Sequence, residues 1–123
     1  MPRNISFALT TPQFLDGSKD ITRRSGWLFA HSGDTLCAVK KSQGLGKGGK
    51  IERLGMIVLV TVRREQLRRL TDDLDYGFAE TTREGFPEGH PLHYPSAFVE
   101  FFCASHKEVT PDSVIARLEF KRL

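Results

Sequence analysis

The sequence contains little cysteine and no long apolar run. Cys37 and Cys103 are its only cysteines, and apolar residues flank both, which argues against a disulfide framework and predicts two buried thiols in a reducing compartment. No stretch reaches the roughly 20 apolar residues that a membrane-spanning helix needs. Residues 1–6 also lack the apolar core of a signal peptide. These absences predict a cytoplasmic protein with no membrane partner.

Nothing in the composition indicates a disordered chain. Hydrophobic residues make up 39% of the sequence and charged residues 27%, and nine phenylalanines are available for a core. A length of 123 residues suffices to bury one modest core without disulfides. We therefore expect a single domain over residues 1–123.

Positive charge is concentrated in the first part of the chain. Residues 1–71 hold 13 Lys and Arg against 5 Asp and Glu, a net charge of +8, whereas residues 72–123 hold 5 against 10, a net charge of −5. A basic face of this kind favours a phosphate-bearing partner such as nucleic acid. A solvated, self-complementary surface explains the same distribution equally well.

Residue patterns predict short strands and helices in mixed order. Strands are expected over residues 5–9, 21–24, 34–39, 53–64 and 114–120, and helices over 11–17, 66–72, 76–84 and 96–105. Thr11 is the expected hydroxyl cap of the first helix, residues 34–64 should form a long hairpin, and Phe98, Phe101 and Phe102 should be core. The predicted fold class is α+β, a small and strongly bent sheet or barrel with helices around it.

Residues 17–24, Gly-Ser-Lys-Asp-Ile-Thr-Arg-Arg, gather three cations and a threonine just after the first predicted helix. If Arg23 and Arg24 converge on Lys19, they should lower the pKa of its ammonium group. A lysine with a lowered pKa beside Thr22 is typical of phosphate binding or of catalysis.

Four segments, in this order and spacing, resemble the ASCH domain: Ile5-Ser6-Phe7 with residues 17–24, Gly33-Asp34, Glu84-Gly85-Phe86, and Arg117-Leu118-Glu119-Phe120. The most specific part is Gly-x-Lys-x-x-Thr-x-Arg ahead of Gly-Asp, and the resemblance covers nearly the whole chain. ASCH domains belong to the PUA-like superfamily. The resemblance therefore implies a small mixed β-barrel with flanking helices and a cleft that receives RNA or a nucleobase.

The resemblance also implies a catalytic hypothesis. In ASCH members that hydrolyse N4-acetylcytidine, a lysine and a threonine with two residues between them act with a downstream glutamate, and Lys19, Thr22 and Glu84 match them. Thr22 would attack the acyl carbon, a neutral Lys19 would take its proton, and Glu84 would protonate the leaving amine. Arg24 would stabilise negative charge. In the structural alternative, Lys19 and Arg24 pair with acidic neighbours, Thr22 lies in a strand, and Glu84 caps a helix.

The chain departs from the compact hydrolases of the family by being longer at residues 44–50 and 87–95. A lysine-rich loop beside a cleft suits a phosphate backbone, and Trp27 or Phe29 could stack a base, although a lone tryptophan is more commonly core. The leading prediction is an RNA-binding module whose ligand is RNA, a nucleoside or a nucleotide. Its predicted contacts are Lys19, Arg23, Arg24, Trp27, Lys40, Lys41, Lys47 and Lys50. The alternatives are an N4-acetylcytidine amidohydrolase and a ribonuclease that uses the same cleft.

Three further expectations concern Arg23 and the histidines. Arg23 has the opposite strand parity to Arg24 and is expected to point away from the cleft. His90, His93, Cys103 and His106 are zinc-ligand types, but their spacing fits no common zinc site, so no metal or cofactor is expected. His106 is interpreted as a cation at the end of a helix.

Overall fold

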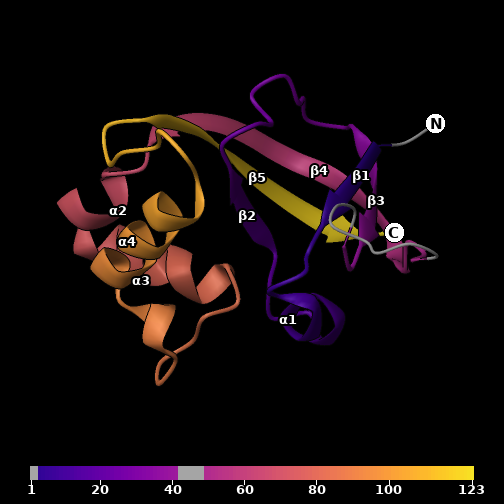
Figure 1. Cartoon of the computed structure of the whole chain (residues 1–123), viewed down its shortest axis with the longest axis horizontal. Coiled ribbons are helices and arrows are strands. Elements are labelled where there is room, and N and C mark those ends of the chain that lie inside the picture. The colour runs from indigo at the N-terminus through magenta and orange to yellow at the C-terminus, as the bar shows by residue number, and fades with distance from the viewer. Residues whose placement is uncertain (1–2, 42–48) are drawn as a thin grey trace.

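The computed structural model describes residues 3–41 and 49–123, in which strands and helices alternate (Figure 1). The strands are β1 (Arg3–Ser6), β2 (Ile21–Arg24), β3 (Thr35–Val39), β4 (Arg53–Gln66) and β5 (Val114–Arg122). The helices are α1 (Thr11–Asp16), α2 (Arg69–Asp72), α3 (Leu74–Arg83), a 3-10 turn over Pro91–His93, and α4 (Pro95–Ser105). Every predicted element is present; β2 has the predicted bounds, and the other elements have shifted ends.

The five strands form one sheet in the order β1-β3-β4-β5-β2. β1 and β3 are parallel, and the other pairs are antiparallel. The predicted hairpin is confirmed, with Leu36 of β3 opposite Ile57 of β4. The pairing of β4 with β5 shifts register between Leu59 and Thr61, and such a bulge bends a sheet. β4 and β5 therefore run through the molecule as a long curved ribbon (Figure 1).

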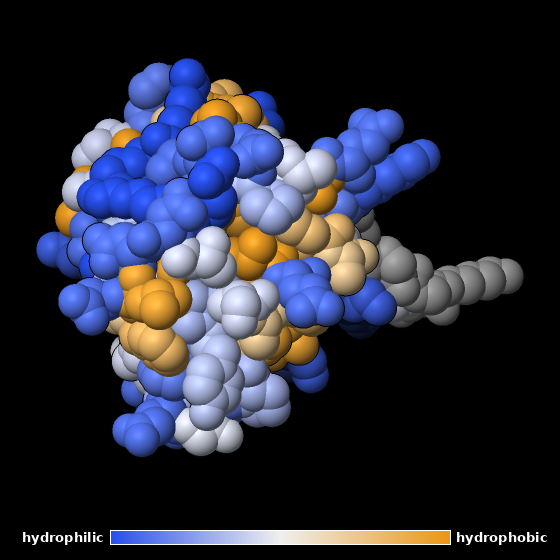
Figure 2. All heavy atoms as spheres, turned by 90° about the vertical axis from the view of Figure 1, so that its left-hand side faces the viewer, coloured by the Kyte–Doolittle hydropathy of each residue, from blue (hydrophilic) through white to orange (hydrophobic). Residues whose placement is uncertain are grey.

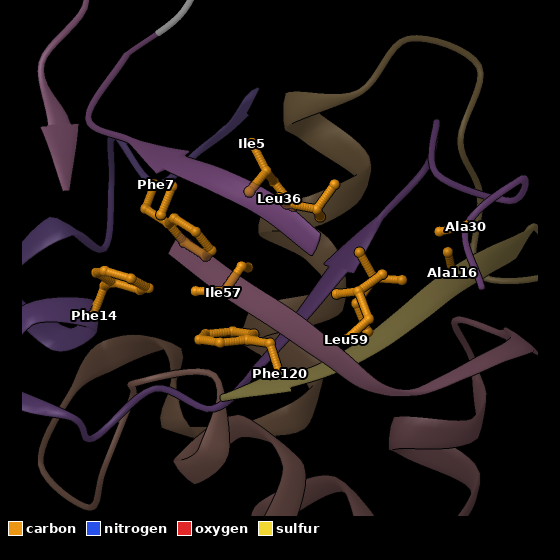
Figure 3. Packing of buried hydrophobic residues seen from close by; sticks show 11 residues of the cluster. Ile5, Phe7, Phe14, Ala30, Leu36, Ile57, Leu59, Ala116 and Phe120 are labelled. Carbon is orange, nitrogen blue, oxygen red and sulfur yellow. The ribbon is translucent and has the colours of Figure 1, made fainter. Parts of the chain in front are cut away.

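One apolar cluster fills the concave side of the sheet and is covered by α1 (Figure 3). The rings of Phe7 and Phe14 stack with centroids 4.8 Å apart, and Phe120 lies within 5.9 Å of both. The cluster comprises Ile5, Phe7, Phe14, Ala30, Leu36, Ala38, Ile57, Leu59, Ala116, Leu118 and Phe120. It is built by residues from both ends of the chain, so the N-terminal segment and β5 are fixed together.

A second apolar cluster joins the helices to the far end of β5. Its members are Leu67, Leu70, Phe86, Phe98, Val99, Phe102 and Ile115. Asp73 caps α3 by accepting the backbone N–H of Tyr76 at 3.2 Å, as the aspartate-rich sequence there predicts. Seen from this helical end, the surface is largely hydrophilic with apolar patches between (Figure 2).

Several sequence predictions need correction. The first strand ends at Ser6 because Phe7 begins a turn that the Thr10 N–H closes onto the Phe7 carbonyl at 3.1 Å. The cap position of α1 is Thr10, whose side chain makes no capping bond, while the Thr11 hydroxyl donates to that same Phe7 carbonyl. Phe101 is not core, since 38% of it is exposed. Cys37 is buried, but Cys103 is only partly so.

The coarse fold prediction is confirmed: the chain is a mixed α+β structure with a curled five-stranded sheet and flanking helices. Within residues 3–41 and 49–123, no helix has the length and apolarity to cross a membrane.

The aromatic stack predicts where stability resides. Replacing the fully buried Phe14 by Ala should lower the free energy of unfolding by about 3–5 kcal/mol, because the cavity left under α1 cannot close completely. The neighbouring Leu15, 49% exposed, is the matched control, and Leu15→Ala should change the free energy of unfolding by less than about 0.5 kcal/mol. Urea denaturation measures both, and equal losses would contradict the assignment of the core.

Candidate functional site

A cavity of about 290 Å³ lies where the two edge strands of the sheet approach α4. Its polar wall consists of Lys19, Thr22, Arg23, Arg24 and Glu84. Its apolar wall consists of Phe86, Phe98, Phe101 and Phe102, with His106 beside them. The cationic segment found in the sequence and the distant Glu84 therefore lie at one cavity.

Backbone contacts bring Lys19 to the end of α3. Gly17, in the left-handed region at φ +83°, ends α1, and the Lys19 N–H then donates to the Gln13 carbonyl at 3.2 Å. Gly85, at φ +103°, lies against this turn so closely that an added Cβ would be 2.8 Å from the Cβ of Gln13. This close approach sets the residue before it, Glu84, beside Lys19.

Lys19 and Glu84 form a buried ion pair. The Lys19 Nζ donates to the Glu84 Oε1 at 2.9 Å and to the Glu84 backbone carbonyl at 2.8 Å. Burial lowers the pKa of Lys19, Arg24 and Arg23 lower it further, and Glu84 opposes the change. The predicted direction is thus correct, although burial has a larger effect than the neighbouring arginines. A buried amine of this kind loses its proton more readily than an exposed lysine does.

Arg23 binds the other carboxylate oxygen of Glu84. Its Nη1 donates to the Glu84 Oε2 at 3.3 Å, and its Nη2 donates to Glu80, Glu65 and the Tyr76 hydroxyl at 2.7, 3.0 and 3.2 Å. Burial alone would lower the pKa of Arg23, but Glu84, Glu80 and Glu65 outweigh it and raise the pKa. The expectation that Arg23 points away from the site is wrong, because its long side chain reaches Glu84. Since that side chain has no exposed surface, a phosphate has no access to it.

A second arginine completes this network. Arg117 of β5 lies directly opposite Arg23 of β2 in the sheet, and both bind Glu80. Burial would raise the pKa of Glu80, but Arg117 and Arg23 hold it at about 2. Two arginines paired across a sheet repel each other, so a buried carboxylate between them is physically required.

Thr22 and Arg24 lie together on β2. The Arg24 Nε donates to the Thr22 Oγ1 at 3.0 Å, and its Nη2 donates to the Ser6 carbonyl at the end of β1. The arginine thus bridges the two edge strands of the sheet. Burial lowers the pKa of Arg24 to about 10, and Glu84 opposes this. In the described residues no carboxylate pairs with Arg24, so only the Lys19 part of the predicted acidic pairing is found.

The remaining predicted nucleic-acid contacts lie outside this cavity. Lys40, Lys41 and Lys50 line a separate cavity of about 370 Å³, where the Lys40 Nζ is 4.0 Å from the Glu52 carboxylate. Trp27 is half-buried against the sheet core and stacks on Phe29, with ring centroids 5.3 Å apart. Lys47 lies outside the described residues.

The site has members that the sequence did not reveal. Glu80 precedes Glu84 by one helical turn, and this i,i+4 spacing could have indicated that both face the same cations. Phe101 lies in α4 and His106 directly follows it, but nothing in the sequence around them distinguishes a cavity wall from a core. Glu65 and Tyr76, which share a hydrogen bond at 2.9 Å, could be assigned only once the strand order was known.

The histidines do not gather into a metal site. In the described part of the chain, no group of three or more His, Cys, Asp or Glu side chains could hold a metal ion. The His90 Nδ1 accepts the Leu92 N–H, while the His93 and His106 Nδ1 atoms bond the carbonyls of Phe86 and Phe102. His106 does follow α4, as the sequence indicates.

Comparison with known proteins identifies a structural relative. No family model matches the chain, and no curated protein matches it in sequence. Among solved structures, protein EF3133 from Enterococcus faecalis V583, of family DUF984, matches with a TM-score of 0.60 and 16% identity. The match covers 100% of this chain and 80% of the other. At this identity the likeness shows a shared fold.

The buried network predicts an asymmetry between two arginines. Arg23→Met leaves three carboxylates without their shared cation and should lower the free energy of unfolding by about 3–5 kcal/mol. Arg68 also pairs with two carboxylates, but on the surface, so Arg68→Met should unfold at nearly the parent urea concentration. Equal effects in urea denaturation would contradict the burial of the Arg23 network.

The low pKa of Glu80 predicts an acid-sensitive fold. Because folding depresses the pKa of Glu80 from 4.5 to about 2, its carboxylate contributes fully to the free energy of unfolding above pH 4.5. This contribution is lost as the pH falls towards 2. Glu80→Gln should therefore weaken the pH dependence of unfolding between pH 5 and 2, whereas the exposed Glu100→Gln should retain it. Chemical denaturation at a series of pH values measures the slopes, and an unchanged slope in Glu80→Gln would refute the assignment.

Proposed function

We propose that this protein hydrolyses the exocyclic amide of an N4-acylated cytosine, in a PUA-like barrel of ASCH type. The observation that carries the proposal is the convergence of Lys19, Thr22 and Glu84 on one cavity, with the Lys19 ammonium buried against the Glu84 carboxylate. These are the residues that match the catalytic lysine, threonine and glutamate in the ASCH resemblance. The sheet curvature and flanking helices are also those that the resemblance implies.

The buried pair can supply both an acid and a base. The Lys19 Nζ and the Glu84 Oε1 are 2.9 Å apart, and transfer of one proton between them would convert two charges into a neutral amine and a neutral acid. Burial favours this neutral form, since it penalises separated charges. The neutral amine is then the general base and the protonated carboxyl is the general acid.

The reaction follows in two balanced stages. In the first, Lys19 takes the Thr22 hydroxyl proton while the Oγ1 bonds to the acyl carbon, and Glu84 protonates the amine as the C–N bond breaks. This leaves an acyl ester on Thr22, free cytosine amine and the original ion pair. In the second, a water hydrolyses the ester, so the carboxylic acid departs and the threonine hydroxyl is restored.

Arg24 supports the first stage electrostatically. Its Nε already donates to the Thr22 Oγ1 at 3.0 Å, so the guanidinium stabilises the negative charge that grows as this hydroxyl loses its proton. The same bond limits the rotation of the threonine side chain. Thr22 is also buried, which restricts competing contacts with water.

The dimensions and walls of the cavity suit one base. At about 290 Å³ it lies just below the range for small-molecule sites, which is roughly 300–1,000 Å³. Phe86 and Phe101 contribute aromatic surface to the wall opposite the polar groups, and such surface packs well against a planar ring. The ring can therefore rest on the apolar wall while its amide faces Lys19 and Glu84.

RNA binding without chemistry is the second candidate. The observation in its favour is that Lys40, Lys41 and Lys50 line one cavity. These three lysines form a cationic surface apart from the buried network. A ribonuclease would use the same cavity and remains a prediction. Steep weakening of RNA association with salt, without turnover or cleavage, would favour the binding module.

Turnover of N4-acetylcytidine tests the proposal. Lys19→Met, Thr22→Val and Glu84→Gln should each lower kcat/KM by ~100-fold or more, because each removes a nucleophile, base or acid. Thr22→Ser, which keeps the hydroxyl, is the matched control and should retain most activity. Chromatography detects released cytidine, and mass spectrometry should detect acetylated Thr22 when hydrolysis of the ester is slow.

Two outcomes would overturn this function. One is the absence of cytidine release by the folded parent protein. The other is release that Thr22→Val and Lys19→Met leave unchanged, since the chemistry would then lie elsewhere.

A further inference from the structure

Arg24 is a partly buried cation that forms no ion pair with a carboxylate in the described part of the chain. Its Nε and Nη2 are bonded to the Thr22 hydroxyl and the Ser6 carbonyl, both of them uncharged acceptors. No acceptor for its Nη1, and no carboxylate within salt-bridge distance, is found in residues 3–41 and 49–123. Withdrawing an unpaired charge from water is costly, and an anionic ligand beside Arg24 would offset that cost.

Arg24 stands between two cavities. Ser6, Ala8 and Arg24 line both the catalytic cavity and a second one of about 460 Å³. Trp27 and Lys41 line the second cavity but not the first, and Lys41 also borders the cavity of Lys40 and Lys50. A ligand that extends from one cavity to the other therefore passes the guanidinium of Arg24.

The second cavity carries the groups that a nucleotide needs. Trp27 offers an aromatic surface, already stacked on Phe29, and the Arg3 guanidinium lies 4.6 Å from the Phe29 ring centroid. Lys41 adds an exposed ammonium group, and Asn4 a side-chain amide that can both donate and accept. Stacking surfaces beside cations are the usual basis of single-strand binding.

We infer that the second cavity is a subsite for the nucleotide adjoining the acylated cytidine, with the connecting phosphate on Arg24 and the neighbouring base on Trp27. The inference rests on the proposed function, whose cavity it extends. It specifies the substrate as an acylated cytidine within a single strand rather than a free nucleoside. Lys41 binds the same phosphate or the next one.

Three substrates of increasing length test the subsite: N4-acetylcytidine, its monophosphates, and a dinucleotide that contains it. The dinucleotide should have a kcat/KM about tenfold above that of the nucleoside, the scale of one base–aromatic contact together with a phosphate contact. This advantage should shrink as salt rises, because the phosphate contact is ionic.

Two variants assign the advantage to the second cavity. Lys41→Ala and Trp27→Leu should each reduce the preference for the dinucleotide several-fold while leaving turnover of the nucleoside near the parent value. Lys121→Ala removes an exposed lysine of β5 that lines none of these cavities, so the preference should persist. Because Trp27 also packs on the core, the exposed Lys41 is the decisive position.

The outcomes separate the two proposals. Equal kcat/KM for nucleoside and dinucleotide overturns the subsite. A monophosphate whose kcat/KM equals that of the dinucleotide overturns the stacking of a second base. If no substrate is turned over, the proposed chemistry fails, and equilibrium binding then decides the subsite. Tighter binding of the dinucleotide than the nucleoside, weakened by Lys41→Ala, supports it, and equal binding refutes it.

Discussion

The site depends on one carboxylate held by two cations. Glu84 receives Lys19 at one oxygen and Arg23 at the other, so the end of α3 is fixed to the segment that follows α1. Arg23 is held in turn by Glu80 and Glu65. A buried network of this kind contributes little net stability compared with apolar packing, because desolvation offsets the attraction between the charges. The position of this network beside the cavity is therefore better explained by the buried, hydrogen-bonded environment that it gives Lys19.

The fold creates the space that this network borders. Curling of the sheet brings its edges, β1 and β2, close enough for the Arg24 guanidinium to reach the Ser6 carbonyl. β1 and β2 do not pair there, so side chains rather than backbone hydrogen bonds connect the two edges. The phenylalanines of α4 lie beside this connection. The cavity consequently has a polar wall from β2, Lys19 and Glu84, and an apolar wall to which α4 contributes three phenylalanines. This division suits a planar ring with one reactive polar group.

Much of the local structure could be predicted from the sequence, but the connections between elements could not. Periodicity and turn residues identified the strands and helices, and the order of motifs brought Lys19, Thr22 and Glu84 together. The parallel pairing of β1 with β3 and the position of Arg117 opposite Arg23 depend on contacts between distant strands. Phe101 shares its helical spacing with core residues, so only the packed structure shows it at the cavity.

We propose that the Lys19–Glu84 pair serves reactivity rather than stability. The double variant Lys19→Met/Glu84→Leu replaces the pair by apolar side chains and preserves net charge, and its urea denaturation should be measured beside its turnover of N4-acetylcytidine. The account predicts a free energy of unfolding equal to or above that of the parent, with turnover abolished. A strongly destabilised variant that still hydrolyses the substrate would contradict it.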